Sequence, residues 1–213
     1  MLAQCYDELQ QYSSAIRGYL NTRKILLTKS NQEHQYYGIT TTIFQTNMAL
    51  GTCYVESKDF KNAIIYLQNA LKSTKDPKET AYAKEMLQLT YLKCGDNFFK
   101  YAEENEETYG YENICKYYNE AIKYYNKSIS INIINKNHIR SYEKKAYAYF
   151  QLQNFFEAKK CLEKTISLLP KNAKQNRILL LEKLKTIENR LKTQSFPKED
   201  HHDKNGKNNF KIK

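Results

Sequence analysis

The sequence predicts an all-α protein built from repeated helical hairpins that stack into an elongated solenoid. The 213 residues include six glycines, three prolines and no tryptophan, and the abundant Leu, Lys, Glu, Ala and Gln favour helices. Small and aromatic residues recur at a constant spacing along most of the chain, which is the signature of a repeat architecture. A basic amphipathic segment follows the last repeated unit, as expected for the helix that closes a solenoid.

The repeated unit is a tyrosine followed nine residues later by an alanine. The pairs are Tyr6 and Ala15, Tyr54 and Ala63, and Tyr149 and Ala158. A small residue precedes each tyrosine by three positions, namely Ala3, Gly51 and Ala146, and the segment Tyr118–Ser128 repeats the second half of the unit around Ala121. The small residues let two antiparallel helices approach closely, and large apolar residues at helical spacing fill the gaps between hairpins. A single hairpin cannot bury its apolar face, so the hairpins must stack.

This pattern resembles the tetratricopeptide repeat over most of residues 1–170, although no copy has the consensus tryptophan. The copies at Leu50–Ala70 and Ala146–Pro170 match best. The resemblance implies an all-α solenoid of about four repeats plus a C-terminal capping helix, wound as a right-handed superhelix within residues 1–193. The first helix of each hairpin would line a concave, protein-binding groove. The alternative is an unrelated helical bundle with chance spacing.

The third copy is interrupted, because Tyr91 and Ala121 are 30 residues apart instead of nine. The simplest account lengthens both helices of a hairpin around 92–117 by about ten residues, which projects it by about 15 Å. A break at Gly95–Asp96 into a separate short helix is the alternative. Either way, the acidic run Glu103–Glu107 lies at or near the tip. A further 11 residues between the first two copies predict longer helices around Gln32–Ile43.

Both ends of the repeat array depart from the unit. Met1 falls in the middle of the first helix of its copy, so one to two turns of that helix are expected to be missing. A capping helix is predicted over 172–193, and its buried side is assigned to residues at three-to-four spacing: Ile178, Leu181, Leu184, Ile187 and Leu191. Residues 194–213 are polar and basic, and they predict a disordered tail.

Charge and cysteine usage restrict the class of protein. The net charge of +11 suits nucleic acid, an anionic membrane or an acidic protein as partner. The five cysteines are scattered and form no C-x-x-C pair, which argues against a disulfide framework or a zinc site and favours a reducing compartment. The first residues do not resemble a signal peptide, and no run approaches the roughly 20 apolar residues of a membrane span. A cytoplasmic protein is expected.

Nothing in the sequence indicates catalysis. It contains no GxxxxGK[ST], GxGxxG or HExxH motif, and no nucleophile can be paired with a base. His34 and His138 have no metal-ligand spacing to cysteines or acids, and the segment His201–Asp203 is expected to be a solvated part of the tail. We therefore expect no enzyme activity, no catalytic residue, no metal site and no cofactor.

The predicted function is that of a scaffold or adaptor that binds a peptide or partner subunit in the groove, within a larger assembly such as a cytoskeletal or ciliary one. The residues expected to line the groove are Gln45, Met48, Thr52, Val55, Tyr82, Glu85, Leu89, Arg140, Lys144, Tyr147 and Phe150. Two alternatives remain. The basic C-terminal region could contact RNA or another nucleic acid, and the groove could hold a chaperone C-terminus. Of the positions equivalent to the family's carboxylate clamp, Arg140 and Lys144 suit a carboxylate, whereas Met48, Thr52 and Met86 do not.

Overall fold

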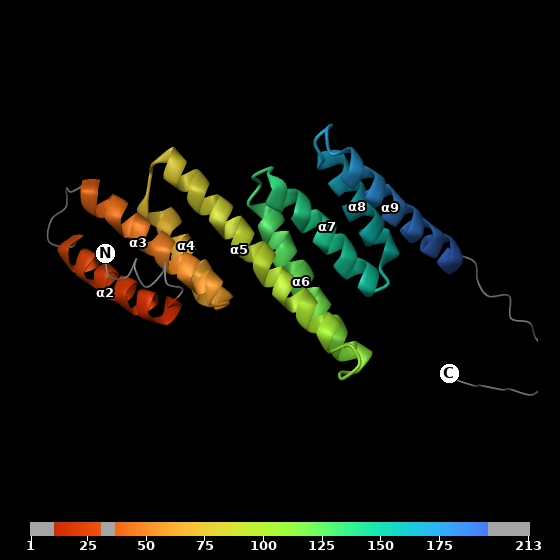
Figure 1. Cartoon of the computed structure of the whole chain (residues 1–213), viewed down its shortest axis with the longest axis horizontal. Helices are drawn as coiled ribbons and strands as arrows, with labels where there is room; N and C mark the ends of the chain where they lie inside the picture. Colours follow the sequence, from red (N-terminus) through yellow and green to blue (C-terminus); the bar gives the residue numbers. More distant parts are fainter. Residues whose placement is uncertain (1–10, 31–36, 196–213) are drawn as a thin grey trace, which may run out of the picture.

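The computed structural model describes residues 11–30 and 37–195, which form eight α-helices and no strand (Figure 1). The helices are α2 (Tyr12–Ser30), α3 (Tyr37–Glu56), α4 (Phe60–Ser73), α5 (Pro77–Glu104), α6 (Tyr111–Ser130), α7 (Lys136–Gln151), α8 (Phe155–Leu168) and α9 (Lys174–Ser195). The predicted all-α solenoid is confirmed. The first helix of the first copy, residues 31–36 and residues 196–213 of the predicted tail lie outside the described residues, whereas residues 194–195, also assigned to the tail, belong to α9.

Each helix packs against the next one along the chain, so the hairpins α3–α4, α5–α6 and α7–α8 follow one another along the long axis (Figure 1). The first helices of successive hairpins also contact one another directly. Lys93 of α5 pairs with Glu56 of α3 at 3.0 Å, and Lys183 of α9 lies 3.9 Å from Glu143 of α7. We call the surface formed by α3, α5, α7 and α9 the first-helix face.

The nine-residue spacing has a structural basis in two matching turns. Lys58 and Gln153, four residues after the respective tyrosines, adopt positive φ values of 62° and 57°. The next residue is an N-cap in both turns: Asp59 accepts a hydrogen bond from the Asn62 amide, and Asn154 accepts one from the Glu157 amide, each at 3.2 Å. Asp and Asn are favoured caps because their side-chain oxygen satisfies an amide of the first helical turn. Local chemistry therefore determines where the second helix begins.

Close approach of the paired helices depends on small side chains. Ala63, Ala121 and Ala158 are completely buried. A Cβ atom on Gly51 would lie 2.6 Å from Cγ of Leu67, which is far inside van der Waals contact. The sequence prediction that small residues lie where two helices touch is confirmed.

The α5–α6 hairpin is longer than its neighbours. The 28 residues of α5 are eight more than in α3 and 12 more than in α7, and the 20 residues of α6 are six more than in α4 or α8. No break occurs at Gly95, where α5 continues. A Cβ atom on Gly95 would lie 2.5 Å from Cε1 of the Tyr125 ring. Glycine at this position therefore allows close packing of α6 onto α5.

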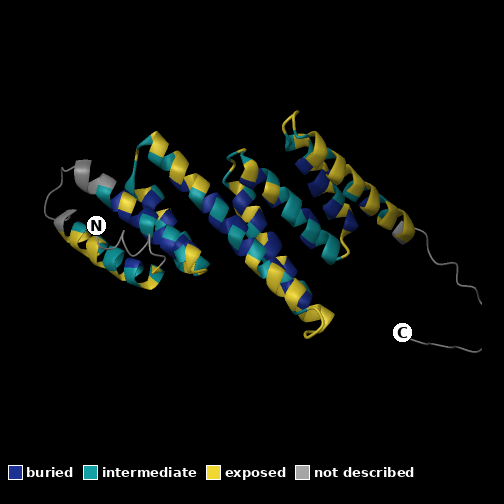
Figure 2. Ribbon diagram, viewed as in Figure 1, coloured by how far each residue is buried: buried dark blue, intermediate teal, exposed yellow. Residues whose placement is uncertain are grey.

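Three buried clusters connect the hairpins. Each cluster combines both helices of one hairpin with the first helix of the next, and Figure 2 shows the buried residues along the facing sides of the helices. Tyr125, Leu67 and Leu162 are among the largest completely buried side chains. This sharing of the core is the reason that no hairpin of such a solenoid is stable alone.

The capping helix buries part of the predicted side, because Leu184, Ile187 and Leu191 pack in the last cluster, but Leu180 takes the place of Ile178 and Leu181. Leu180 and Ile187 are 4% exposed, whereas Ile178 and Leu181 are 59% and 48% exposed. The assignment of Ile178 and Leu181 to the buried side is therefore wrong. Arg177 adds polar contacts on this side of α9, since its guanidinium donates to the carbonyl oxygens of Ile166 and Leu169 at the end of α8, at 3.3 and 3.2 Å.

Candidate functional site

Most of the predicted groove residues have some access to solvent on α3, α5 and α7. Gln45, Tyr82, Glu85 and Arg140 are exposed, and Thr52, Leu89, Lys144, Tyr147 and Phe150 are partly buried. These positions belong to the first-helix face. The remaining two, Met48 and Val55, are 5% and 4% exposed.

Met48 and Val55 are therefore core residues, and their assignment to an exposed groove is corrected. Met48 packs in the cluster that contains Leu67 of α4 and Leu87 of α5. The physical reason is a small rotation. At 3.6 residues per turn, Met48 lies about 60° around the helix from Gln45, which is enough to turn it from solvent toward the next hairpin.

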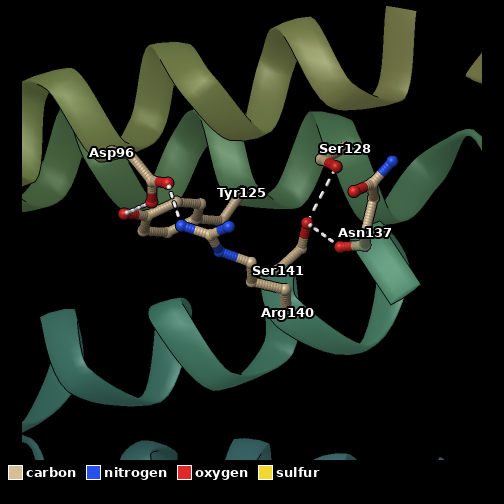
Figure 3. A network of polar contacts seen from close by, with 6 residues as sticks. All are labelled: Asp96, Tyr125, Ser128, Asn137, Arg140 and Ser141. Atoms are coloured by element: carbon tan, nitrogen blue, oxygen red, sulfur yellow. Dashed lines mark hydrogen bonds and ion pairs between the residues drawn. The ribbon is translucent and has the colours of Figure 1, made fainter. Parts of the chain in front are cut away.

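Asp96 of α5 contacts both α6 and α7 (Figure 3). One carboxylate oxygen accepts a hydrogen bond from the Tyr125 hydroxyl of α6 at 3.0 Å, and the other lies 3.2 Å from the Arg140 guanidinium of α7. Burial, together with the charge of Asp96, raises the pKa of Tyr125 far above its usual value. Arg140 keeps 57% of its side chain exposed, so it still presents donors to solvent. The repeat pattern does not indicate Asp96, because this residue belongs to the insertion and not to the repeated unit.

A buried polar cluster beneath Arg140 joins α7 to α6 (Figure 3). The Ser141 hydroxyl oxygen lies 2.8 Å from the Ser128 hydroxyl oxygen and 2.8 Å from the Asn137 carbonyl oxygen. Ser128 in turn donates to the Gln88 carbonyl oxygen of α5 at 2.9 Å. All four residues are buried. Because satisfied buried hydrogen bonds are directional, they restrict the rotation of α7 and hold Arg140 on the exposed side.

Lys144, the other predicted carboxylate-binding residue, is also directed at α5. Its ammonium lies 5.7 Å from the centre of the Phe99 ring, within the range of a cation–π contact. Arg140 and Lys144 are thus both in contact with α5. Their geometry is set by the long hairpin, which the repeat pattern alone does not describe.

An open pocket of about 650 Å³ lies between α7 and α9, with the end of α8 beneath it. We call it the α7–α9 pocket. Eight of its 14 lining residues are apolar, and Lys136, Arg140 and Glu143 are its charged members. The apolar residues are Ile134, Ile139, Leu168, Leu169, Pro170, Ala173, Leu179 and Leu180. Of the 14 lining residues, Arg140 alone was predicted from the sequence to face a binding groove. The others could not be predicted, because the pocket depends on how α9 packs against α7.

A smaller hollow of about 200 Å³ lies further along the same two helices and is lined by Tyr147, Phe150, Lys183, Thr186 and Ile187. The Tyr147 hydroxyl donates to Glu143 at 2.6 Å and also contacts the Lys183 ammonium. Burial and the neighbouring Glu143 raise the pKa of Tyr147. Two of the predicted groove residues, Tyr147 and Phe150, therefore line this hollow. The Tyr147 hydroxyl itself is bound to other side chains of the protein.

Several other reactive side chains are buried in helix contacts, among them Cys94, Cys161 and His138, whereas Cys115 is partly buried. Burial raises the pKa of the Cys94 thiol to about 11, and it also raises that of Cys161. Burial, with a smaller effect of Lys164, lowers the pKa of His138. Within residues 11–30 and 37–195, no three His, Cys, Asp or Glu side chains come together as a metal site. In the same ranges, no helix is both long enough and apolar enough to span a bilayer.

The stacked hairpins with a continuous first-helix face define a helical-repeat solenoid protein. A tetratricopeptide-repeat family model matches residues 44–77, 114–132 and 139–172, which correspond to the α3–α4 hairpin, to α6 and to the α7–α8 hairpin. A search of curated proteins finds no match to the chain. The chain is a tetratricopeptide-repeat protein, and proteins built from these repeats generally mediate protein–protein interactions. The unmatched α5 is the helix lengthened by the insertion.

Proposed function

We propose that this protein is an interaction scaffold that binds a polypeptide segment of a partner across its first-helix face. The observation that supports it most directly is the α7–α9 pocket, which is large enough for an apolar side chain and opens beside the exposed Arg140. Concave sites with mostly apolar walls and a few polar groups at the rim are typical of ligand recognition. Gln45, Tyr82 and Glu85 extend the contact surface toward α3.

The charges at the pocket favour acidic residues next to the inserted apolar side chain. Lys136 is exposed, and Arg140 is exposed although it is also paired with Asp96, whereas the one lining carboxylate, Glu143, is engaged by Tyr147 and Lys183. Opposite charges across an interface mainly set orientation and association rate, while the apolar contact supplies most of the affinity. The preferred segment therefore combines one large apolar residue with flanking Asp or Glu.

Selection from a display library of random 12-residue peptides tests this preference. Leu179 lines the pocket and is 50% exposed, whereas Leu181 is 48% exposed on the same helix and does not line it. Leu179→Glu is expected to weaken the selected peptides about tenfold, as for a residue at the centre of an interface. Leu181→Glu, with the same change in charge, is the matched control and should bind normally. Equal losses in both variants, or selection of basic peptides, would contradict the proposal.

We extend the proposal to a larger cytoplasmic assembly, of the cytoskeletal or ciliary kind that proteins of this family often join. Affinity purification from the native source, repeated after nuclease treatment, tests this extension. We expect protein partners that remain bound after nuclease treatment and that no longer bind the Leu179→Glu variant. Recovery of RNA or DNA without a stable protein partner would instead support a nucleic-acid-associated function of the basic chain.

A further inference from the structure

The tip of the α5–α6 hairpin carries the opposite charge to the chain as a whole. Between residues 100 and 112 there are five glutamates and one lysine, a net charge of −4 in a chain of net charge +11. The lysine, Lys100, pairs with Glu104 at 3.3 Å. We call residues 100–112 the acidic tip. All of its charged side chains are exposed.

The acidic tip projects beyond the neighbouring hairpins (Figure 1). Leu152, just after the end of α7, packs against the cluster that contains Tyr118. Helix α6 extends seven residues beyond Tyr118 toward the tip, to its first residue Tyr111. At 1.5 Å per residue this is a length of about 10 Å. This distance is close to the Debye length of about 10 Å at 0.1 M salt. The lysines of the neighbouring hairpins, unlike Lys116, which follows Glu112 by one helical turn, are therefore largely screened from an ion that approaches the tip.

Tyrosine rings accompany these charges. Tyr101 stacks on Tyr109 with ring centres 6.5 Å apart, and it contacts Tyr117 at 4.5 Å. Tyr109 is 41% exposed, and Tyr111 is 55% exposed. Exposed aromatic rings together with carboxylates are suited to Lys and Arg side chains, because the ring face attracts the cation while its aliphatic stem packs on the ring.

A buried hydroxyl at the base of the acidic tip has no hydrogen-bond partner in the part of the chain that the structure describes. Tyr118 is 2% exposed, and its hydroxyl is one of the buried polar groups left unsatisfied. Long side chains in a helix point toward its N-terminus, which for α6 is the tip. The negative charges of Glu106 and Glu103 act on this hydroxyl and, after burial, contribute to raising its pKa to about 12. A buried polar group without a partner is energetically unfavourable, and a donor that enters from the tip would satisfy it.

We propose that the acidic tip docks a lysine- or arginine-rich segment of a partner protein. The carboxylates accept hydrogen bonds from its cationic groups, Tyr109 and Tyr111 pack on their stems, and one cationic side chain reaches between Glu103 and Glu106 toward Tyr118. This surface is separate from the α7–α9 pocket, which favours acidic segments. The protein would thus bridge two partners of opposite charge, which goes beyond binding on the first-helix face.

Fluorescence anisotropy with labelled deca-lysine, and with deca-glutamate as the contrasting probe, tests the proposal on the full chain. A protein of net charge +11 should repel deca-lysine unless the acidic tip binds it. The double variant Glu103→Gln, Glu106→Gln should raise the dissociation constant about three- to tenfold. The matched control, Glu163→Gln with Glu182→Gln on α8 and α9, changes the net charge equally and should bind like the wild type.

Two further variants separate docking from a diffuse charge effect. Tyr111→Ala should weaken the binding of deca-lysine, whereas Phe156→Ala, which removes a ring of 67% exposure on α8 outside the tip, should not. Tyr118→Phe keeps the buried ring and should lower affinity about two- to fivefold without lowering the melting temperature. The proposal is overturned if deca-lysine does not bind at 50 mM NaCl, if tip and control variants bind equally, or if Tyr118→Phe binds like the wild type. Salt-sensitive self-association of the chain in light scattering would assign the tip to a second copy and would also overturn it.

Discussion

Replacing Gly95 by alanine should destabilise the protein, although helix propensity predicts the opposite. Gly95 lies in the interior of the 28-residue helix α5, where glycine is about 0.8–1.0 kcal/mol less favourable than alanine. The added methyl group, however, would lie 2.5 and 2.7 Å from two carbon atoms of the Tyr125 ring. Carbon atoms in ordinary contact are about 3.5–4.0 Å apart, so the ring or the helix must move by about 1 Å.

The ring has little freedom to move. Tyr125 is completely buried, and its hydroxyl is held by Asp96, which also contacts Arg140. Overpacking of a well-filled core costs about 1–3 kcal/mol, and a rigid ring at this distance belongs near the upper end. After subtraction of the propensity gain, we expect a net loss of about 1–2 kcal/mol in the free energy of unfolding.

Urea unfolding followed by circular dichroism at 222 nm measures this loss through the transition midpoint. In a Tyr125→Leu background, Gly95→Ala should become neutral or stabilising, because the clash is removed while the propensity gain remains. Gly110→Ala is the control for a glycine with open surroundings: nothing described lies within 4 Å of its added Cβ, and only the weaker N-cap of α6 should contribute, a loss of about 1 kcal/mol or less that does not depend on Tyr125. Stabilisation by Gly95→Ala in the otherwise wild-type chain would refute the close contact between α5 and α6.

Three further predictions concern packing, protonation and thiol reactivity. Ala63→Phe overpacks a completely buried contact and should lower the free energy of unfolding by about 1–3 kcal/mol. The control Lys61→Ala changes an exposed residue and should have almost no effect. Equal shifts in melting temperature would show that the helix faces are misassigned. Burial lowers the pKa of His138, so the folded state prefers the neutral ring. The free energy of unfolding should therefore be highest above the pKa of His138 in the unfolded chain, about 6.5, and should fall as the pH decreases below that value. His138→Gln should flatten this dependence in melting curves between pH 7.5 and 5.5, and an unchanged slope would argue against a buried neutral histidine. Cys94, with a pKa near 11, should resist iodoacetamide at pH 8 while the partly buried Cys115 reacts, as read by mass spectrometry; faster reaction of Cys94 would contradict its burial.

The sequence alone determined the repeat, because the chemistry that sets it is local. A positive-φ residue followed by an Asp or Asn cap defines the hairpin turn, and the two best copies share this geometry at Lys58–Asp59 and Gln153–Asn154. The alanine nine residues after the tyrosine then lies at the helix contact, as at Ala63. Such features depend on neighbours a few residues away, so a single sequence contains them.

Tertiary packing decided helix rotation and continuity. Gly95 indicates a weak point in a helix when taken alone, yet it is the residue that admits the Tyr125 ring. In α9, the helical period places Leu180 on the same side as Leu184, Ile187 and Leu191, and this side is the one that packs in the core. The period does not report what this side packs against: Arg177 donates to carbonyl oxygens at the end of α8 and holds α9 against that helix. The α7–α9 pocket, with the half-exposed Leu179 in its lining, forms where α9 packs in this orientation. The energy of that packing depends on both contacting helices at once.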